Sequence, residues 1–382
     1  MEEQAHENVF FRHVDLLRIL GVTIPAKGTS RGLLMKIWYI FVIAVLFINA
    51  ALQGRSMFLP TSLSMKSITL VFFLVNLASA LKLLLVQLNA EMLAKLFQEL
   101  DTPGASDSTP MLKTVHTISR TYVVCLFALL MAWVAYPWMT GDLELPIPYW
   151  FPFNLDTFFK FSCAYSFASF VFFIICYTQD AVDTLLLLIA GQICRRLGAI
   201  RVALLSIGTE EPLRKRGWKR PKAMEDFMGL SILRMAALSR DETLLKEVIR
   251  EHVDIIRLVR TFDIVLDDIF LAQVMQSTLV STMTFFAVSK VDDPIKDMPK
   301  FMFILGATYL QFFMYCWLGE EISDHSDELH RTLYLSEWYK CREKIMKSLV
   351  IMETFTKAHF KLEGGHLFNI DLATFLMVIL NL

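Results

Sequence analysis

The chain has 382 residues, of which 55% are hydrophobic and 20% are charged, and its formal net charge is −1 at pH 7. Soluble domains of this length are less hydrophobic. The net charge by itself says nothing about partners, and we expect no nucleic-acid partner. Neither a phosphate-binding Gly-rich loop nor a nucleophile motif occurs, so the sequence predicts neither an enzyme nor a cofactor site.

Seven apolar stretches are long enough to be considered as membrane spans, because about 20 mostly apolar residues cross the roughly 30 Å hydrocarbon core as a helix. The seven are Leu33–Gln53, Ile68–Leu88, Thr121–Met139, Phe158–Ile193, Ile264–Ser289, Phe301–Gly319 and Leu367–Leu382. The fourth and fifth extend beyond a bilayer, and the seventh is short. The sequence therefore predicts an all-α, polytopic membrane protein with seven transmembrane helices.

The placement of positive charge predicts the orientation of these spans, since Lys and Arg are retained on the cytoplasmic side. The amino-terminal segment and the loops after spans two, four and six carry 29 of the 37 Lys and Arg residues, or 30 with Lys36 near the start of span one. The loops after spans one, three and five carry 5. We therefore expect an inside amino terminus and an outside carboxyl terminus, which is opposite to a G-protein-coupled receptor.

Amphipathic stretches predict further helices inside the cell. One apolar seam precedes span five: Leu245, Val248, His252, Ile255, Val259 and Phe262. Rougher stripes follow span six (Leu329, Leu333, Trp338, Cys341, Ile345, Leu349 and Met352) and occupy the amino-terminal segment (Phe10, Val14, Leu17 and Leu20). Apolar faces at helical spacing favour a cytoplasmic anchor bundle. The alternative is a set of helices lying on lipid.

The expected organisation has four parts. Residues 1–32 form a cytoplasmic amino-terminal segment, and residues 33–319 hold six spans, with a long cytoplasmic loop over 195–263. Residues 320–366 form a cytoplasmic anchor helix, and residues 367–382 form the last, pore-lining helix. Within the long loop, the basic segment Arg214–Lys222 either contacts anionic lipid or is a solvated loop that obeys the charge rule.

Several polar and sulfur-bearing residues need separate interpretations. Acidic residues lie near the inner ends of spans four and five: Asp180, Asp183, Asp267 and Asp268. Either a water-filled vestibule solvates them or the helices have already left the hydrocarbon. His325 and His330 are five residues apart and do not share a helix face, so we predict no metal site. The six cysteines are expected to be small buried hydrophobes without disulfides.

Aromatic residues concentrate in the outer halves of several spans. Interfacial aromatic belts account for many of them, but small-molecule sites are also mostly apolar with a few polar groups. We therefore predict a pocket for a small, uncharged, largely apolar ligand. Its candidate residues are Phe72, Phe73, Asn76, Trp133, Tyr136, Trp138, Phe161, Tyr165, Thr308 and Tyr309.

Motifs in the last third of the chain resemble a known family. The run from Phe313 to Ile322 resembles the end of span six in insect odorant receptors, and Ser326, Leu329, Tyr334 and Trp338-Tyr339 continue it. The segments from Lys361 to Gly365 and from Ile370 to Phe375 resemble the start of the family's last helix. The matching motifs cover roughly residues 310–382.

The resemblance implies a seven-helix subunit of an odorant-gated, non-selective cation channel. Four subunits would surround one pore lined by the last helix, with Asp371, Thr374 and Val378 as candidate pore residues. The loop after span four is short for the family's co-receptor, so the resemblance implies a ligand-selective subunit that pairs with the olfactory co-receptor. Such a chain would lie among lipids of the plasma membrane, in dendrites of olfactory sensory neurons, and bind a volatile odorant.

Two departures and three alternatives accompany this resemblance. His359 stands where many members have proline, and Ile370–Leu382 would span only about 20 Å as a helix, which suggests a clipped or shortened last helix. A gustatory-type receptor channel is the nearest alternative, although no Gln-Phe pair follows Thr374. A small-molecule transporter would need matched broken helices. A receptor without ion flow would dock partners on Arg214–Lys222.

Overall fold

The computed structural model describes residues 15–22, 32–61, 63–100, 110–140, 145, 149–154, 157–208, 241–290, 294–357 and 360–381. Most of these residues are helical. The helices are α2 (Gly32–Ser56), α3 (Leu63–Leu88), α4 (Ala90–Leu100), α5 (Pro110–Thr140), α6 (Phe158–Ser206), α9 (Asp241–Val288), α10 (Pro294–Leu335), the 3₁₀ turn η1 (Trp338–Lys340), α11 (Glu343–Thr356) and α12 (Leu372–Leu380).

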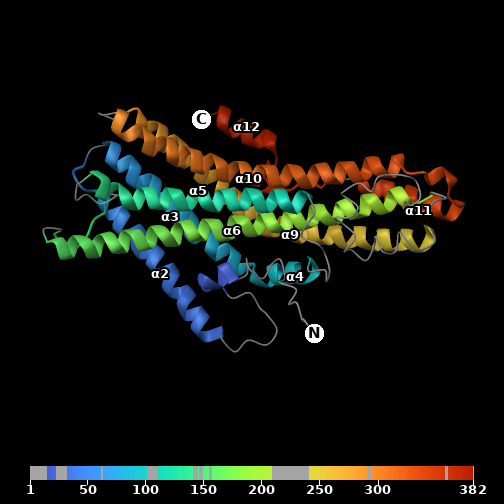
Figure 1. Cartoon of the computed structure of the whole chain (residues 1–382), viewed down its shortest axis with the longest axis horizontal. Helices are drawn as coiled ribbons and strands as arrows, with labels where there is room; N and C mark the ends of the chain where they lie inside the picture. The colour runs from blue at the N-terminus through green and yellow to red at the C-terminus, as the bar shows by residue number, and fades with distance from the viewer. Residues whose placement is uncertain are drawn as a thin grey trace.

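Three helices are much longer than a bilayer is thick. The helices α6, α9 and α10 have 49, 48 and 42 residues, or about 74, 72 and 63 Å at 1.5 Å per residue. Figure 1 shows them running along the long axis of the molecule, with α5 beside α6 and α2 leaning away. The helix α6 packs against α5 and α10, and α9 packs against α3. One long bundle therefore continues from the spans into their extensions.

Within the described residues, five helices are long and apolar enough to cross a membrane: α2, α3, α5, α6 and α10. The helix α9 is not among them, and polar residues such as Gln273, Gln276 and Ser277 lie within its apolar stretch. The helix α12 has only 9 residues. The chain is thus a helical polytopic membrane protein. The helices α9 and α12, which correspond to the fifth and seventh expected spans, are not among these five.

The half of the bundle that contains the C-terminal part of α6 and the N-terminal part of α9 is a packed core. Every residue of α6 from Ala181 to Ile200 is buried, so this half of α6 is surrounded on all sides. All six seam residues that precede span five are buried as well, as a bundle requires. Leu17 and Leu20 are also buried, whereas Phe10 and Val14 lie outside the described residues, as does Arg214–Lys222.

The segment after α10 differs from the single anchor helix that we expected over 320–366. The helix α10 ends at Leu335, a 3₁₀ turn follows, and α11 starts again at Glu343. A small antiparallel hairpin then pairs β1 (Glu363–Gly364) with β2 (Phe368–Asn369). Backbone N–H groups of this hairpin donate to the carboxylates of Asp263 and Asp267 on α9.

The last helix begins at Leu372 and not at residue 367, because the hairpin occupies the residues before it. Asp371 caps it by accepting a hydrogen bond from the Thr374 N–H at 2.7 Å. The residues just before α12 lie very close to α10. A Cβ on Gly319 of α10 would lie 1.9 Å from the Ile370 carbonyl oxygen. Glycine is therefore required at that contact.

All six cysteines are free, and their burial differs from the expectation. Cys194 and Cys316 are buried, and Cys176 and Cys341 are half-buried. Cys125 and Cys163 are exposed, because they lie on helix faces turned away from the bundle. A thiol on such a face of a membrane helix meets lipid and loses little.

Candidate functional site

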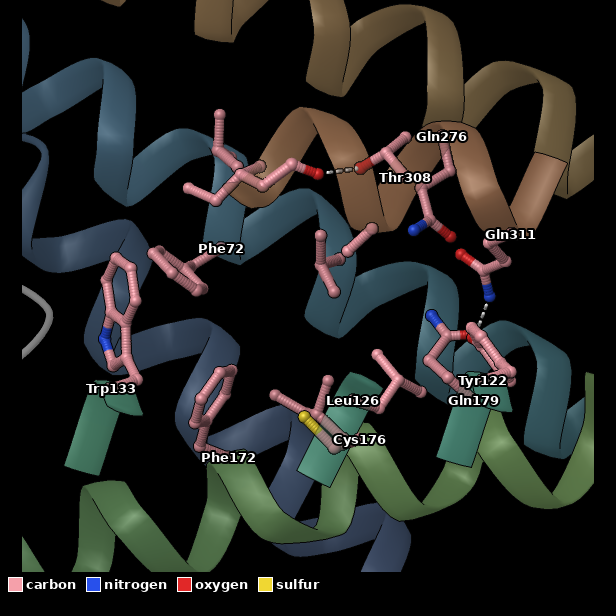
Figure 2. Close-up of a pocket in the computed structure, with 15 residues that line it drawn as sticks. Phe72, Tyr122, Leu126, Trp133, Phe172, Cys176, Gln179, Gln276, Thr308 and Gln311 are labelled. Atoms are coloured by element: carbon pink, nitrogen blue, oxygen red, sulfur yellow. Dashed lines mark hydrogen bonds between the residues drawn. The ribbon is translucent and has the colours of Figure 1, made fainter. Parts of the chain in front are cut away.

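A cavity lies between helices in the membrane part of the bundle (Figure 2). It has about 640 Å³ of empty space, its opening included. Five helices line it: α3, α5, α6, α9 and α10. The lining residues are Val71, Phe72, Val75, Tyr122, Leu126, Trp133, Phe172, Ile175, Cys176, Gln179, Gln276, Ile304, Ala307, Thr308 and Gln311.

One end of the cavity is aromatic. The Phe72 ring centroid lies 5.1 Å from that of Trp133 and 5.9 Å from that of Phe172, in tilted and edge-to-face arrangements. Tyr149, which lies in the loop before α6, belongs to the same buried cluster, and Phe151 packs against it. Such rings offer large apolar surfaces and favour aromatic or aliphatic ligands of matching shape.

The opposite end is polar, and its groups are mostly bonded to one another. Gln311 donates to the Gln179 Oε1 at 3.1 Å and accepts from Gln273 at 3.1 Å. Gln179 donates to Ser79 at 3.2 Å, and the Thr308 hydroxyl donates to a carbonyl one turn earlier on α10. Amides that are satisfied within the protein fix the geometry of this end but leave little for a ligand to bond.

Directly beyond this polar end lies a buried ion pair, which we call the Lys82–Asp183 cluster: Lys82, Asp183, Tyr122, Tyr315 and Gln311. The Lys82 Nζ lies 2.9 Å from Asp183 Oδ1, and both side chains are fully buried. The Tyr122 and Tyr315 hydroxyls donate to the Asp183 carboxylate at 2.9 and 2.6 Å, and the Gln311 amide also donates to it. An ion pair this deep persists only with such additional hydrogen bonds.

This cluster corrects the interpretation of Asp183. Neither a vestibule nor the end of the hydrocarbon explains it, because the bundle itself buries the carboxylate and Lys82 neutralises it. Asp180 is half-buried, Asp267 accepts a backbone hydrogen bond from His366, and Asp268 is exposed. For these three the sequence alternatives stay open.

The cavity contains three of the ten proposed ligand residues: Phe72, Trp133 and Thr308. Asn76 is buried elsewhere and donates to the Leu46 carbonyl, which ties α3 to α2. Phe161 and Tyr165 stack on each other at 5.9 Å, and Tyr165 bonds the Val134 carbonyl.

Four further candidates remain. Phe73 and Tyr309 are half-buried and do not line the cavity, while the side chains of Tyr136 and Trp138 lie outside the described residues.

The three pore candidates lie on and before α12. Asp371 is its cap, Thr374 is buried, and Val378 is half-buried against the core. Phe375 contacts Phe312 and Phe313 of α10, with ring centroids 5.6 and 5.5 Å apart. The helix α12 is therefore seated on α10.

Sequence reasoning missed several cavity residues, including Tyr122, Phe172, Gln179, Gln276 and Gln311. One signal was present for the glutamines. Uncharged polar residues inside apolar spans usually face other helices and not lipid. Applied to Gln179, Gln276 and Gln311, this rule predicts that all three side chains face the interior of the bundle.

This architecture, a helical membrane bundle around an internal, largely apolar cavity, is that of a polytopic membrane protein. A family model described as 7tm Odorant receptor matches residues 49–381. The chain therefore belongs to the insect odorant receptor family, which is a family of receptors and not of enzymes.

Two solved structures of one insect olfactory receptor have the same fold as this chain. The chain superposes on the insect olfactory receptor OR5 from Machilis hrabei in complex with eugenol with a TM-score of 0.75, over 97% of this chain and 95% of that chain, at 15% identity. A second structure of the same receptor gives a TM-score of 0.72, with the same coverage and 16% identity. These likenesses establish the fold.

Three odorant receptors are similar in sequence to parts of this chain. The chain is 24% identical over 281 residues to odorant receptor Or1 of Anopheles gambiae, and 24% identical over 264 residues to odorant receptor 94a of Drosophila melanogaster. Each match covers 67% of this chain and 62% of the relative. Odorant receptor 46a, isoform A, of Drosophila melanogaster is 30% identical over 97 residues, 25% of this chain and 26% of the relative.

Proposed function

We propose that this chain is the odorant-binding, ligand-selective subunit of a heteromeric ligand-gated cation channel. It crosses the plasma membrane of olfactory neuron dendrites seven times, with its amino terminus inside, and assembles with the olfactory co-receptor. The observation that carries the proposal is the open cavity, with about 640 Å³ of empty space including its opening, lined by Phe72, Trp133 and Phe172. It suits a volatile, mostly apolar ligand, in a fold shared with a receptor solved with eugenol.

The route from ligand to pore runs along α10. Thr308 and Gln311 line the cavity, and Phe312 and Phe313, immediately after them, contact Phe375 of α12. A ligand that binds the open arrangement more tightly than the closed one shifts the population toward it. A shift of α10 moves α12 with it.

The helix α12 lines the pore, with Asp371, Thr374 and Val378 as candidates. It packs on α10 and leaves Leu376 and Leu380 exposed, at 56% and 81%. Exposed apolar side chains of this kind offer a surface to neighbouring subunits.

Whole-cell recording tests the proposal. Cells expressing this chain with and without an insect olfactory co-receptor are exposed to a broad panel of volatiles, and surface expression is measured in parallel. We expect a ligand-evoked, non-selective cation current in the presence of the co-receptor. Surface-expressed chain that gives no current with any volatile in either setting would overturn the proposal.

A further inference from the structure

We infer that Gln276 is the polar recognition group of the cavity, and that the preferred ligand is a volatile with an apolar body and one hydroxyl group. This inference rests on the proposed function and narrows its ligand class.

Gln276 combines burial, direction and lack of a partner. It lies on α9, is 6% exposed and lines the cavity. Figure 2 shows its carboxamide projecting from α9 toward the space between Thr308, Gln311 and Tyr122. Its Oε1 has no hydrogen-bond partner within the described residues. A buried amide oxygen without a partner costs free energy that a ligand hydrogen bond recovers.

The hydroxyl groups and the other amide groups of the cavity lining are already engaged. The Tyr122 hydroxyl donates to Asp183, and the Thr308 hydroxyl donates to the Ile304 carbonyl. Gln179 and Gln311 bond each other and their neighbours. A ligand therefore meets in Gln276 a polar group that is ready to bond.

Trp133 is the competing candidate, because its indole nitrogen is also buried without a partner in the described part of the chain. Figure 2 shows that nitrogen on the edge of the ring turned away from the other lining residues. The indole therefore presents its ring to the cavity, and the carboxamide of Gln276 supplies the polar contact.

The chemistry of a carboxamide selects the ligand group. It offers one acceptor oxygen and an N–H donor, and a hydroxyl is both donor and acceptor, so it can bond either end. A methyl ether lacks the donor and leaves Oε1 unpaired, and a hydrocarbon lacks both. The apolar body of the ligand then rests on Phe72 and Phe172, whose rings lie 5.9 Å apart.

The test uses alcohols, each paired with its methyl ether and its parent hydrocarbon, applied to this chain with the co-receptor. For the wild-type chain we expect alcohols to be about 3- to 10-fold more potent than their ethers, the effect of one buried hydrogen bond. In Gln276→Leu and Gln276→Met the two potencies should agree within about 2-fold, because ethers no longer leave an amide unpaired. Thr282→Val is the matched control, since Thr282 is exposed on the same helix.

The outcomes separate the two ideas. Wild-type currents with an unchanged alcohol-to-ether ratio in both Gln276 variants would overturn the inference and leave the proposed function standing. Absence of any current from surface-expressed wild-type chain would overturn the proposed function itself. Two variants of different shape guard against misfolding, and a variant counts only where surface biotinylation matches the wild type.

Discussion

The cavity and the Lys82–Asp183 cluster adjoin and share Tyr122 and Gln311, yet they are built on opposite principles. Phe72 and Phe172 shape the cavity by volume and ring contact. Each charged atom of the cluster is matched to named donors or acceptors. Other apolar side chains can fill the same space at a small cost in stability, whereas removing the partner of a buried charge is strongly destabilising. The contrast suggests that the cluster specifies the fold and the cavity specifies the ligand.

The largest effect is expected from breaking the ion pair. Lys82→Met leaves Asp183 buried without its cation and should cost about 3–5 kcal/mol of stability. Surface expression and thermal unfolding in detergent measure this loss. Lys160→Met is the control, because Lys160 is exposed on α6. Adding Asp183→Asn to Lys82→Met should recover part of the loss, and no recovery would argue against a paired role.

Gln311→Leu lies on the border of the two regions and should disturb both. The substitution removes one donor to Asp183 and one to Gln179, which should cost about 1–3 kcal/mol. It also changes the cavity wall, so potencies should shift among volatiles. Thermal unfolding and dose–response curves on the same preparation measure both. A change confined to one of them would place Gln311 in that region alone.

Phe172→Leu should change ligand choice with little loss of stability. Leucine removes less of the side chain than the Phe→Ala changes that cost about 3–5 kcal/mol, while the altered cavity shape should shift potencies among volatiles by about 10-fold. Phe173→Leu is the matched control, since the neighbouring ring is 45% exposed and lies outside the cavity lining. Equal shifts in both variants would mean that the effect is not local to the cavity.

The sequence predicted these two regions unequally. Apolar length was enough to predict a helical polytopic membrane protein, whereas the orientation drawn from Lys and Arg stays a prediction. The aromatic surplus led to Phe72 and Trp133. The Lys82–Asp183 pair could not be predicted, because its members are 101 residues apart and a polar residue in a span does not name its partner. Gln276 was missed although its place inside an apolar span was a signal that it faces other helices. The hairpin before α12 depends on bonds to α9, which local patterns do not contain.

The smallest effect is on the pH dependence of stability, and it concerns His252 in the N-terminal part of α9. Burial lowers the pKa of His252 from its ordinary value of 6.5. Its neutral form is therefore favoured on folding, and stability falls as the pH drops below about 6.5, because the unfolded chain binds the proton first.

His252→Leu should reduce this acid sensitivity. Thermal unfolding of both proteins near pH 7.5 and near pH 5.5 would show it as a smaller difference for the variant. An equal loss in the two proteins would assign the acid sensitivity to other groups.

The Lys82–Asp183 pair also sets a timing problem for biosynthesis. Lys82 is synthesised 101 residues before Asp183, which is about 5–20 s at ordinary synthesis rates. During that interval the Lys82 ammonium must reach water at the membrane surface or wait beside the insertion machinery, since a lone lysine deep in lipid costs roughly 3 kcal/mol. Lys82 on α3 would then be neutralised only when α6 brings Asp183 into the membrane. The order in which the helices are inserted is therefore part of how this receptor reaches its fold.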